Sequence, residues 1–315
     1  MKAVQIRQYG GNEVLELNSN VPKPVLGNGQ VLVEVHAASI NPIDWKIRMG
    51  HLKEHVPLTM PATLGGDFAG VVMEIGRSDS TLKVGDRVYG YGSPLSGGSG
   101  SFAEFVAALS RNVALAPEKM NAIQAAALPL VGASAIQALE EHIKLQRDQK
   151  VLIHGGGGGI GSIAIQIAKA TGAYVATTAT GDDLEYVREL GADQVINYKN
   201  ESFEAKIKEV DAVFDTVGGT TTAKSFQVLR RGGCLVSMLG QPDETLARQH
   251  EVTAIGQFTR VTTDVLIRLA RLVDSGQVKI RIGKVLSLEK GKEAFQLAEE
   301  GHPNGKVVFE VKAGA

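Results

Sequence analysis

The sequence feature that most constrains the fold is a run of five glycines, Gly155 to Gly159, between two apolar segments. The residues before it, Val151-Leu152-Ile153, are typical of the end of a buried strand. After it, apolar residues recur at the spacing of one helix face, at Ile160, Ile163, Ala164, Ile167 and Ala168. The sequence therefore predicts a tight strand-to-helix turn near the middle of the chain.

Three of these positions, Gly156, Gly158 and Gly161, match the dinucleotide pattern Gly-x-Gly-x-x-Gly. In that pattern the first glycine turns the chain, the second lets the backbone approach a pyrophosphate, and the third packs the helix against the strand. The helix N-terminus then offers unpaired N–H groups to the phosphates. A glycine-rich surface loop is the alternative interpretation, but the strand before the turn and the helix after it favour a dinucleotide site.

Composition excludes several classes of function. The chain has 315 residues, 43% of them hydrophobic, which is enough for one large or two ordinary domains with full cores. Cys234 is the only cysteine, which excludes an internal disulfide and a cysteine-rich structural zinc site. The net charge of −1 argues against nucleic-acid or membrane-surface binding. Lys2 and Arg7 place charges where a signal peptide has its apolar core, so we expect a cytoplasmic protein.

The chain changes character near residue 118. Before this point, short β-branched runs such as 31–35 and 70–75 predict a β-rich domain. Two helices are expected next, at 122–130 and 133–143, interrupted by Pro129 and Gly132. Strands and helices then alternate, with strands expected at 150–154, 174–178, 194–197, 212–216, 233–237 and 252–255. This alternation predicts an α/β fold with a doubly wound parallel sheet, whose ligand lies at the carboxyl ends of the strands.

The end of the second strand of this sheet bears on the choice of cofactor. An NAD-binding protein usually places an acid there, on the ribose 2′-OH, whereas this strand ends Thr177-Thr178-Ala179-Thr180. Asp182 and Asp183 come slightly later, and we interpret them as the N-cap and first-turn acids of a helix. The missing acid favours NADP, although no arginine or lysine is evident beside the strand to hold a 2′-phosphate.

Motifs along nearly the whole chain resemble the quinone oxidoreductase (ζ-crystallin-like) branch of the medium-chain dehydrogenase/reductase superfamily. The segment from Asp148 to Lys169 fits the signature of this branch. Further matches are Asn41-Pro42-Ile43-Asp44, Gly65-Gly66-Asp67-Phe68-Ala69-Gly70, Val84-Gly85-Asp86-Arg87-Val88, Phe214-Asp215-Thr216-Val217-Gly218-Gly219 and Gly305-Lys306-Val307-Val308. The resemblance implies a GroES-like β-rich catalytic domain (1–118 and 278–315), a Rossmann NADP-binding domain (119–277), an active-site cleft between them, and a homodimer.

The resemblance also carries a departure from the zinc-dependent alcohol dehydrogenases. Those enzymes have a cysteine where Asn41 aligns, and a His-Glu pair where this chain has Gly66-Asp67. Without these ligands no zinc is expected to stabilise an alkoxide. The segment from His51 to His55 fits H-x-x-E-H, but the flanking Gly50 and Pro57 leave too short a helix for a metal site. We therefore expect NADPH-dependent reduction of a quinone or an α,β-unsaturated carbonyl.

Candidate site residues follow from the turn and from the resemblance. The turn itself supplies backbone to the pyrophosphate from Gly156, Gly158, Gly159, Ile160 and Gly161. The rest of the cofactor is expected near Ser134, Thr178, Thr180, Tyr198, Gly218, Gly219, Leu239, Gly240, Gln257 and Phe258. Asn41 and Asp44 are the catalytic candidates, and the substrate is expected near Trp45, Gly66 and Tyr91.

Several of these roles have structural alternatives. Asn41 or a water could donate a hydrogen bond to the substrate's carbonyl oxygen, whereas Asp44 could cap a helix and Ser134 could start one. No residue stands out as the proton donor, so solvent is an alternative source. Two other functions also remain open, namely alcohol dehydrogenase chemistry with an unrecognised metal and a non-catalytic, NADPH-binding structural or sensor role.

Overall fold

A computed structural model describes residues 1–77, 81–301 and 304–314 of the chain, which divides into two compact units. The first unit comprises residues 1–130, 261–274 and 280–315, and the second comprises 131–260 and 275–279. The division differs from the boundaries expected at 118 and 278, because helix α9 (Thr263–Asp274) packs on the β-rich unit. The Tyr89 hydroxyl donates to the Leu266 carbonyl of this helix at 2.5 Å.

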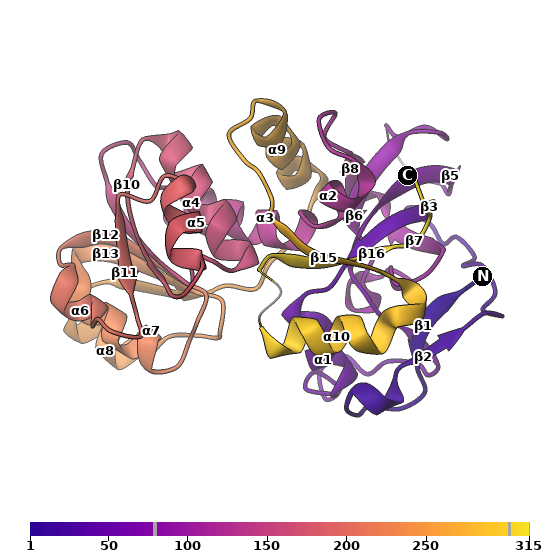
Figure 1. Ribbon diagram of the computed structural model, residues 1–315, viewed down its shortest axis with the longest axis horizontal. Coiled ribbons are helices and arrows are strands. Elements are labelled where there is room, and N and C mark those ends of the chain that lie inside the picture. The colour runs from indigo at the N-terminus through magenta and orange to yellow at the C-terminus, as the bar shows by residue number, and fades with distance from the viewer. Residues whose placement is uncertain (78–80, 302–303, 315) are drawn as a thin grey trace. The chain divides into compact units, whose positions relative to one another are not determined.

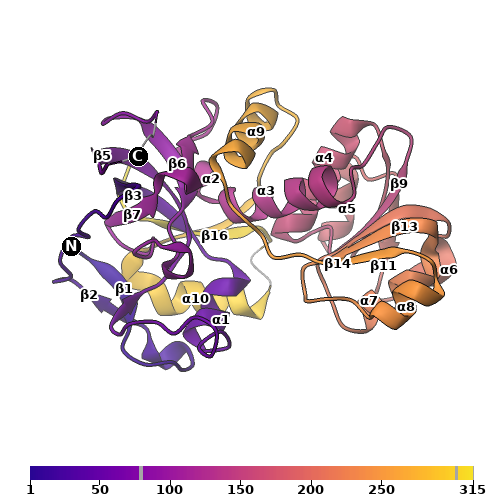
Figure 2. The same cartoon turned by 180° about the vertical axis from the view of Figure 1, so that it is seen from behind.

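The first unit is built from two mainly antiparallel sheets (Figures 1 and 2). The smaller has the order β2-β1-β4, from β1 (Ala3–Ile6), β2 (Glu16–Asn18) and β4 (Ala62–Thr63). The larger has the order β15-β16-β3-β5-β6-β8, with β7 also paired to β3. Its strands are β3 (Gln30–Ser39), β5 (Asp67–Ile75), β6 (Arg87–Tyr91), β7 (Phe105–Leu109), β8 (Val113–Leu115), β15 (Ile282–Ser287) and β16 (Lys306–Glu310).

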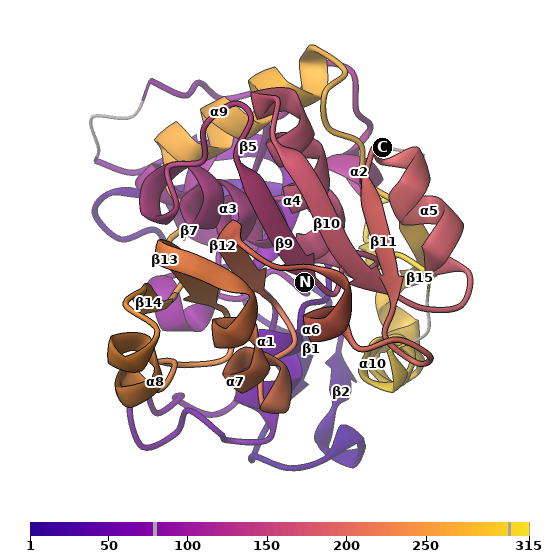
Figure 3. The same ribbon diagram turned by 90° about the vertical axis from the view of Figure 1, so that its left-hand side faces the viewer.

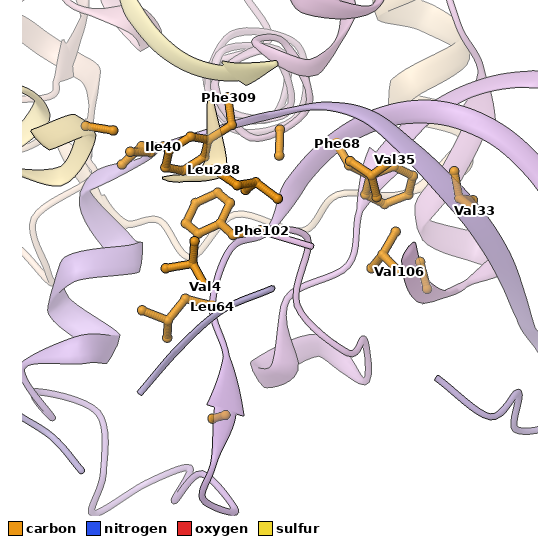
Figure 4. Packing of buried hydrophobic residues seen from close by; sticks show 14 of the residues in the cluster. Val4, Val33, Val35, Ile40, Leu64, Phe68, Phe102, Val106, Leu288 and Phe309 are labelled. Atoms are coloured by element: carbon orange, nitrogen blue, oxygen red, sulfur yellow. The ribbon is translucent and has the colours of Figure 1, made fainter. Parts of the chain in front are cut away.

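Aromatic rings fill the core of this unit, where Phe102 lies at the centre (Figure 4). Its ring meets those of Phe295 and Phe309 edge to face, with centroids 5.8 and 5.1 Å apart. Helices cover the sheets, and the short ones include 3₁₀ turns. They are η1 (Asn12–Val14), α1 (Pro42–Arg48), η2 (Pro94–Ser96), η3 (Ser110–Asn112), α2 (Ala122–Ala126), α9, η6 (Leu288–Lys290) and α10 (Gly291–Glu300).

Helix α10 is not among the helices predicted from the sequence, although its apolar residues recur at helical spacing. It lies beside α1 (Figures 1 and 2), and Arg48 of α1 joins the two helices. Its guanidinium is 1% exposed and pairs with the Glu299 carboxylate at 2.7 Å. This pairing could not be predicted from the sequence because the two residues are far apart in the chain. It connects the N-terminal and C-terminal parts of the chain within one unit.

The second unit contains a six-stranded parallel sheet in the order β11-β10-β9-β12-β13-β14. Its strands are β9 (Lys150–His154), β10 (Tyr174–Ala179), β11 (Gln194–Asn197), β12 (Val210–Asp215), β13 (Leu229–Ser237) and β14 (Thr253–Gly256). Helices α4 (Gly159–Thr171) and α5 (Asp183–Glu189) cover one face of the sheet. The other face carries α6 (Phe203–Lys206), α7 (Thr220–Ser225), η5 (Phe226–Val228) and α8 (Glu244–Gln249) (Figures 1 and 3).

This arrangement confirms the predicted doubly wound sheet, with all six expected strands within a few residues of their predicted positions. The strand order reverses between β9 and β12, and ligands of such folds bind at that reversal. The glycine run after β9 lies at this point, so topology and motif indicate the same place.

One prediction about the helices before this sheet is wrong. Pro129 and Gly132 were expected to separate the helices 122–130 and 133–143, but the break lies at residues 127–128, and α3 (Pro129–Ile136) begins at the proline and contains the glycine. Proline suits the first turn of a helix because the N–H that it lacks would have no partner there. A π-helical segment, η4 (Gln137–His142), continues α3.

Across the described residues, no helix combines the length and the apolar character needed to cross a membrane.

Candidate functional site

The glycine turn closes at Gly155, whose φ of +73° lies in the left-handed region. The Gly-x-Gly-x-x-Gly pattern predicts this role for Gly156, its first glycine. Gly156 is instead held by packing, since a Cβ there would lie 2.2 Å from Thr177 Oγ1. The left-handed turn thus begins one residue earlier than predicted, and Gly156 keeps β9 close to β10.

Gly158 and Gly161 differ in what surrounds them. A Cβ on Gly161 would lie 2.2 Å from the Gly155 carbonyl oxygen, so α4 packs against the turn without room for a side chain. At Gly158, the exposed N-cap of α4, a Cβ would meet only the Gly155 carbonyl oxygen within 4 Å among the described residues, at 3.3 Å. The backbone at Gly158 is therefore open, with Gly159 and Ile160 following it as the first residues of the helix. These features fit a pyrophosphate cradle.

Thr178 has its hydroxyl committed within the protein. Its Oγ1 accepts from the Gly155 N–H at 3.2 Å and lies 3.2 Å from His154 Nδ1. On the other side of the ring, His154 Nε2 is 3.1 Å from Ser225 Oγ, which itself donates to the Thr221 carbonyl. Because the Ser225 proton is used in this way, we assign the ring proton to Nε2, so that Thr178 donates to Nδ1.

Burial lowers the pKa of His154 to about 4, which keeps the ring neutral and agrees with this assignment. The chain of hydrogen bonds therefore runs from Ser225 through His154 and Thr178 to the Gly155 N–H. The structure gives Thr178 a place beneath the turn, where it is 4% exposed. This is a different setting from the ribose contact expected of it.

Thr180 and Tyr198 come together at the ends of β10 and β11. The register pairs Ala179 with Asn197, and the Tyr198 N–H donates to the Ala179 carbonyl at 3.3 Å. Tyr198 is 51% exposed, and the Lys199 ammonium lies 5.8 Å from its ring centroid. Lys199 is a cation that the sequence analysis missed, because it follows β11 and only the sheet register brings it beside the end of β10.

Gly218 and Gly219 follow the end of β12, and Gly240 follows the end of β13. Asp215 Oδ1 accepts from the N–H groups of Val217 and Gly218 at 2.9 and 3.0 Å, which fixes the loop after β12. Gly218 and Gly219 have φ values of +86° and +62°. Across the gap between strands, a Cβ on Gly218 would lie 2.7 Å from Leu239 Cβ. The structure thus places Gly218, Gly219, Leu239 and Gly240 together at the carboxyl edge of the sheet.

Gln257 follows β14 at the same edge and carries an unpaired acceptor. Its Nε2 donates to the Ser134 carbonyl at 3.0 Å, which sets the direction of the amide. Its Oε1 is buried and has no hydrogen-bond partner in the described part of the chain. A buried unpaired acceptor is costly, so this oxygen fits a donor from a ligand, such as a carboxamide N–H.

Ser134 and Phe258 differ in their surroundings although both border Gln257. The Ser134 hydroxyl lies 2.8 Å from Thr259 Oγ1 and the residue is fully buried in mid-helix, so it does not start a helix. Phe258 is 78% exposed, while its carbonyl accepts from Gln137 Nε2 at 3.4 Å. An aromatic side chain this exposed is available to a planar ligand.

The first unit contains a buried polar cluster of Asn41, Asp44, Asp67 and Lys306. Asn41 Nδ2 donates to Asp67 Oδ2 at 2.8 Å, and its Oδ1 accepts from the Lys306 ammonium at 2.5 Å. Lys306 also donates to the Ile40 carbonyl at 2.7 Å. Asn41 is 1% exposed, so both ends of its amide are engaged inside the protein.

Asp44 combines a structural role with an unusual titration. As the third residue of α1, its carboxylate accepts from the Asn41 N–H at 2.8 Å, which is half of a capping box. Burial raises the pKa of Asp44 to about 7 and that of Asp67 to about 6. Burial also lowers the pKa of Lys306, against the attraction of the two carboxylates. The cluster therefore exchanges a proton near neutral pH.

The three expected substrate-side residues all lie in the first unit, and Tyr91 is the one that interacts with the cluster. The Tyr91 ring covers Gly66 so closely that a Cβ there would lie 2.1 Å from Tyr91 Cε2. Burial, with the nearby charges of Asp44 and Asp67, raises the pKa of the Tyr91 phenol, which stays protonated at neutral pH. Trp45 is half-buried and packs against the hydrophobic core.

The described residues contain no group of three or more His, Cys, Asp or Glu side chains that could hold a metal ion. The His51–His55 segment forms turns beyond the end of α1 rather than a helix. Within the polar cluster, the Lys306 ammonium opposes a divalent cation near Asp44 and Asp67. The donor set of this cluster thus fits an internal hydrogen-bond network better than a zinc site.

Two family profiles match the chain. "Alcohol dehydrogenase GroES-like domain" matches residues 27–118, and "Zinc-binding dehydrogenase" matches residues 190–309. Each unit is matched in part, and together with the solved structures the matches confirm the GroES-like and Rossmann architecture.

Individual relatives match nearly the whole chain. The 2-methylene-furan-3-one reductase of Solanum lycopersicum is 37% identical over 98% of this chain and 79% of its own. The chloroplastic NADPH-dependent alkenal/one oxidoreductase of Arabidopsis thaliana is 36% identical with the same coverage. Among solved structures, the quinone oxidoreductase of Coxiella burnetii aligns with a TM-score of 0.88 at 36% identity, over 99% of both chains.

Proposed function

Because the chain belongs to the quinone oxidoreductase branch of the medium-chain dehydrogenase/reductase superfamily, we propose that it is an NADPH-dependent reductase of quinones or α,β-unsaturated carbonyls. The relatives' names support this activity, since they include an NADPH-dependent alkenal/one oxidoreductase and a quinone oxidoreductase. The predicted reaction class and the predicted cofactor, NADP(H), are both confirmed by these relationships.

The observation that carries the proposal is the open backbone at Gly158. It stands at the N-terminus of a 13-residue helix, at the strand reversal, with a carbonyl but no side chain facing the position of its Cβ. The partial positive charge of a helix N-terminus favours a bound pyrophosphate. The close packing of Gly161 and the hydrogen bond between Thr178 and His154 stabilise the conformation of this turn.

When bound, NADPH supplies a hydride to the electrophilic carbon of the substrate, whose oxygen then takes up a proton. On the cofactor side, we propose that the Gln257 Oε1 accepts a hydrogen bond from the nicotinamide carboxamide. Phe258 then lies against the ring, and Lys199 and Tyr198 lie near the adenosine end. Gly218, Gly219, Leu239 and Gly240 border the remaining ribose.

On the substrate side, we propose that Asn41 acts by fixing the polar cluster rather than by donating to substrate, since both ends of its amide have internal partners. Asp44 and Asp67 hold a proton near neutral pH, beside the Tyr91 phenol. Solvent remains the proposed source of the proton delivered to product. Such a reduction needs no Lewis acid because the substrate carbon is already electrophilic.

The test is an NADPH-oxidation screen over simple quinones and enones, run beside NADH, with the zinc content measured on the same purified sample. We expect steady turnover with at least one quinone or enone and substoichiometric zinc. Stoichiometric zinc together with alcohol oxidation would favour alcohol dehydrogenase chemistry. Tight NADPH binding without turnover on any substrate would favour a non-catalytic role.

Two further expectations stay predictions, namely the cytoplasmic location and the homodimer. For the homodimer we propose the outer edge of β14 as the contact, because this strand ends the sheet in the described structure. The edge strand of a sheet carries backbone N–H and C=O groups with which a second copy can pair.

A further inference from the structure

Asp183 occupies a position in the cofactor site that its sequence context did not suggest. We interpreted it as a first-turn acid of α5, and it is indeed the first residue of that helix. Its side chain also reaches the glycine turn. The point where a Cβ on Gly157 would lie is 2.1 Å from Asp183 Oδ2 and 2.3 Å from its Cγ.

The carboxylate therefore fills the space beside Gly157, in the middle of the dinucleotide pattern. Asp183 also follows Gly161 by 22 residues, close to the separation of about 20 at which dinucleotide folds place an acid for the adenosine ribose. The strand end itself lacks an acid, and the acid that reaches the turn comes from the first turn of the next helix. The spacing in the sequence and the contact with Gly157 both favour the adenosine ribose as the group that Asp183 would contact.

We propose that Asp183 is a specificity-determining residue of the cofactor site, which accepts a ribose hydroxyl and opposes a 2′-phosphate. This proposal rests on the proposed function and refines its cofactor. A carboxylate accepts hydrogen bonds from the 2′-OH of NADH, whereas it repels the phosphate of NADPH. Lys199, beside Tyr198 at the end of β11, supplies an opposite charge at the same edge of the sheet. The chain consequently accepts NADH as well as NADPH.

The test measures binding, so that it remains informative if no substrate is reduced. Isothermal titration gives the Kd of NADP⁺ and of NAD⁺ for the full-length protein and for Asp183→Asn. The amide retains the shape of the side chain but loses its charge. We expect the ratio of Kd for NAD⁺ to Kd for NADP⁺ to rise about tenfold in this variant, and the rise to shrink at high salt.

Asp182→Asn is the matched control. Asp182 is the preceding residue, exposed, and is not among the nearest neighbours of Gly157. The Asp182→Asn substitution removes one charge from the same end of the helix. We expect its ratio of Kd for NAD⁺ to Kd for NADP⁺ to stay within about twofold of the unsubstituted protein, as for a solvent-screened charge. An unchanged ratio in Asp183→Asn, or an equal rise in both variants, would overturn the proposal.

Melting temperatures of both variants show whether the fold is intact. If Asp183→Asn does not fold, Asp183→Ser replaces it, since serine also suits a helix start. With a quinone as substrate, the ratio of the initial rate with NADPH to that with NADH should change in the same direction as the ratio of the Kd values. Absence of quinone and enone reduction would count against the proposed function alone, because the binding ratio would still report on Asp183.

Discussion

At the scale of single residues, the hydroxyl of Thr178 illustrates how a polar group near a ligand site can serve the chain itself. Its position before the end of β10 suggested a ribose contact. In the structure it links His154 to the Gly155 N–H, and so supports the residue at which the turn closes. Its contribution to cofactor binding is therefore indirect, through the shape of the turn.

Thr178→Val tests this indirect role. Valine keeps the shape but leaves His154 Nδ1 and the Gly155 N–H without a partner, so we expect a loss of about 1–3 kcal/mol in the free energy of unfolding. The KM for NADPH should rise severalfold while kcat changes little, since no reacting atom is touched. Thr178→Ser, which restores the hydroxyl, should recover both values. Equal KM values in the valine and unsubstituted proteins would contradict the role.

The buried Asp44 makes stability depend on pH in an unusual direction. Its folded pKa of about 7 lies above the unfolded value of about 3.9, so the folded state binds the proton more tightly. The stability from that proton is fully present below about pH 4 and is lost as the pH rises to about 7. A shift of this size corresponds to roughly 4 kcal/mol.

Asp44→Asn should remove this dependence. We expect urea unfolding at pH 5 to 8 to show the unsubstituted protein losing stability relative to the variant as the pH rises. The amide oxygen can still accept from the Asn41 N–H, so the capping contact survives. A difference between the two proteins that is constant with pH would show that Asp44 is ionised throughout this range.

At the scale of elements, the strand β9, the turn and α4 form a unit in which each glycine has a different constraint. Gly161 is constrained by the protein, because its Cβ would lie 2.2 Å from the Gly155 carbonyl oxygen, whereas a Cβ on Gly158 would meet that same oxygen at 3.3 Å. The two positions belong to one sequence pattern but should respond to substitution in different ways.

Gly158→Val should abolish NADPH binding and leave the melting temperature within a few degrees of the unsubstituted protein, because only the pyrophosphate approach is blocked. Gly161→Val should lower the free energy of unfolding by about 1–3 kcal/mol or more, since α4 must move away from the turn. Calorimetric melting and NADPH titration of both variants check this. A strongly destabilised Gly158→Val would show that the folded protein has no room for a side chain at Gly158.

Elements that carry a local signal could be predicted from the sequence, and those that depend on distant partners could not. The strand 150–154 and the strand 194–197 match β9 and β11, because apolar runs and flanking glycines mark their ends. Helix α10 has helical spacing of its apolar residues but was not predicted, and its apolar face packs in a core with Phe102 and Phe309, far away in the sequence. Lys199 and Lys306 were likewise missed as site residues, because only the sheet registers bring them to Ala179 and Asn41.

At the scale of the whole molecule, the β14 edge of the parallel sheet is covered by a side chain. On the outer side of β14, the side-chain amide of Gln241 pairs with the strand. It accepts from the Gly256 N–H at 2.9 Å and donates to the Ala254 carbonyl at 3.2 Å. The amide thereby occupies backbone groups that a neighbouring strand would use.

Gln241→Ala should therefore strengthen the proposed homodimer. Removal of the amide frees one donor and one acceptor on β14, and we expect the Kd for self-association to fall about fivefold, as for one net hydrogen bond. Sedimentation velocity over a range of protein concentrations measures this value. Gln194→Ala is the control, since Gln194 lies on β11 at the other end of the sheet and donates to the Lys206 carbonyl. Weaker association of Gln241→Ala would mean that the amide supports the contact rather than competing with it, and an equal effect in both variants would place the contact away from β14.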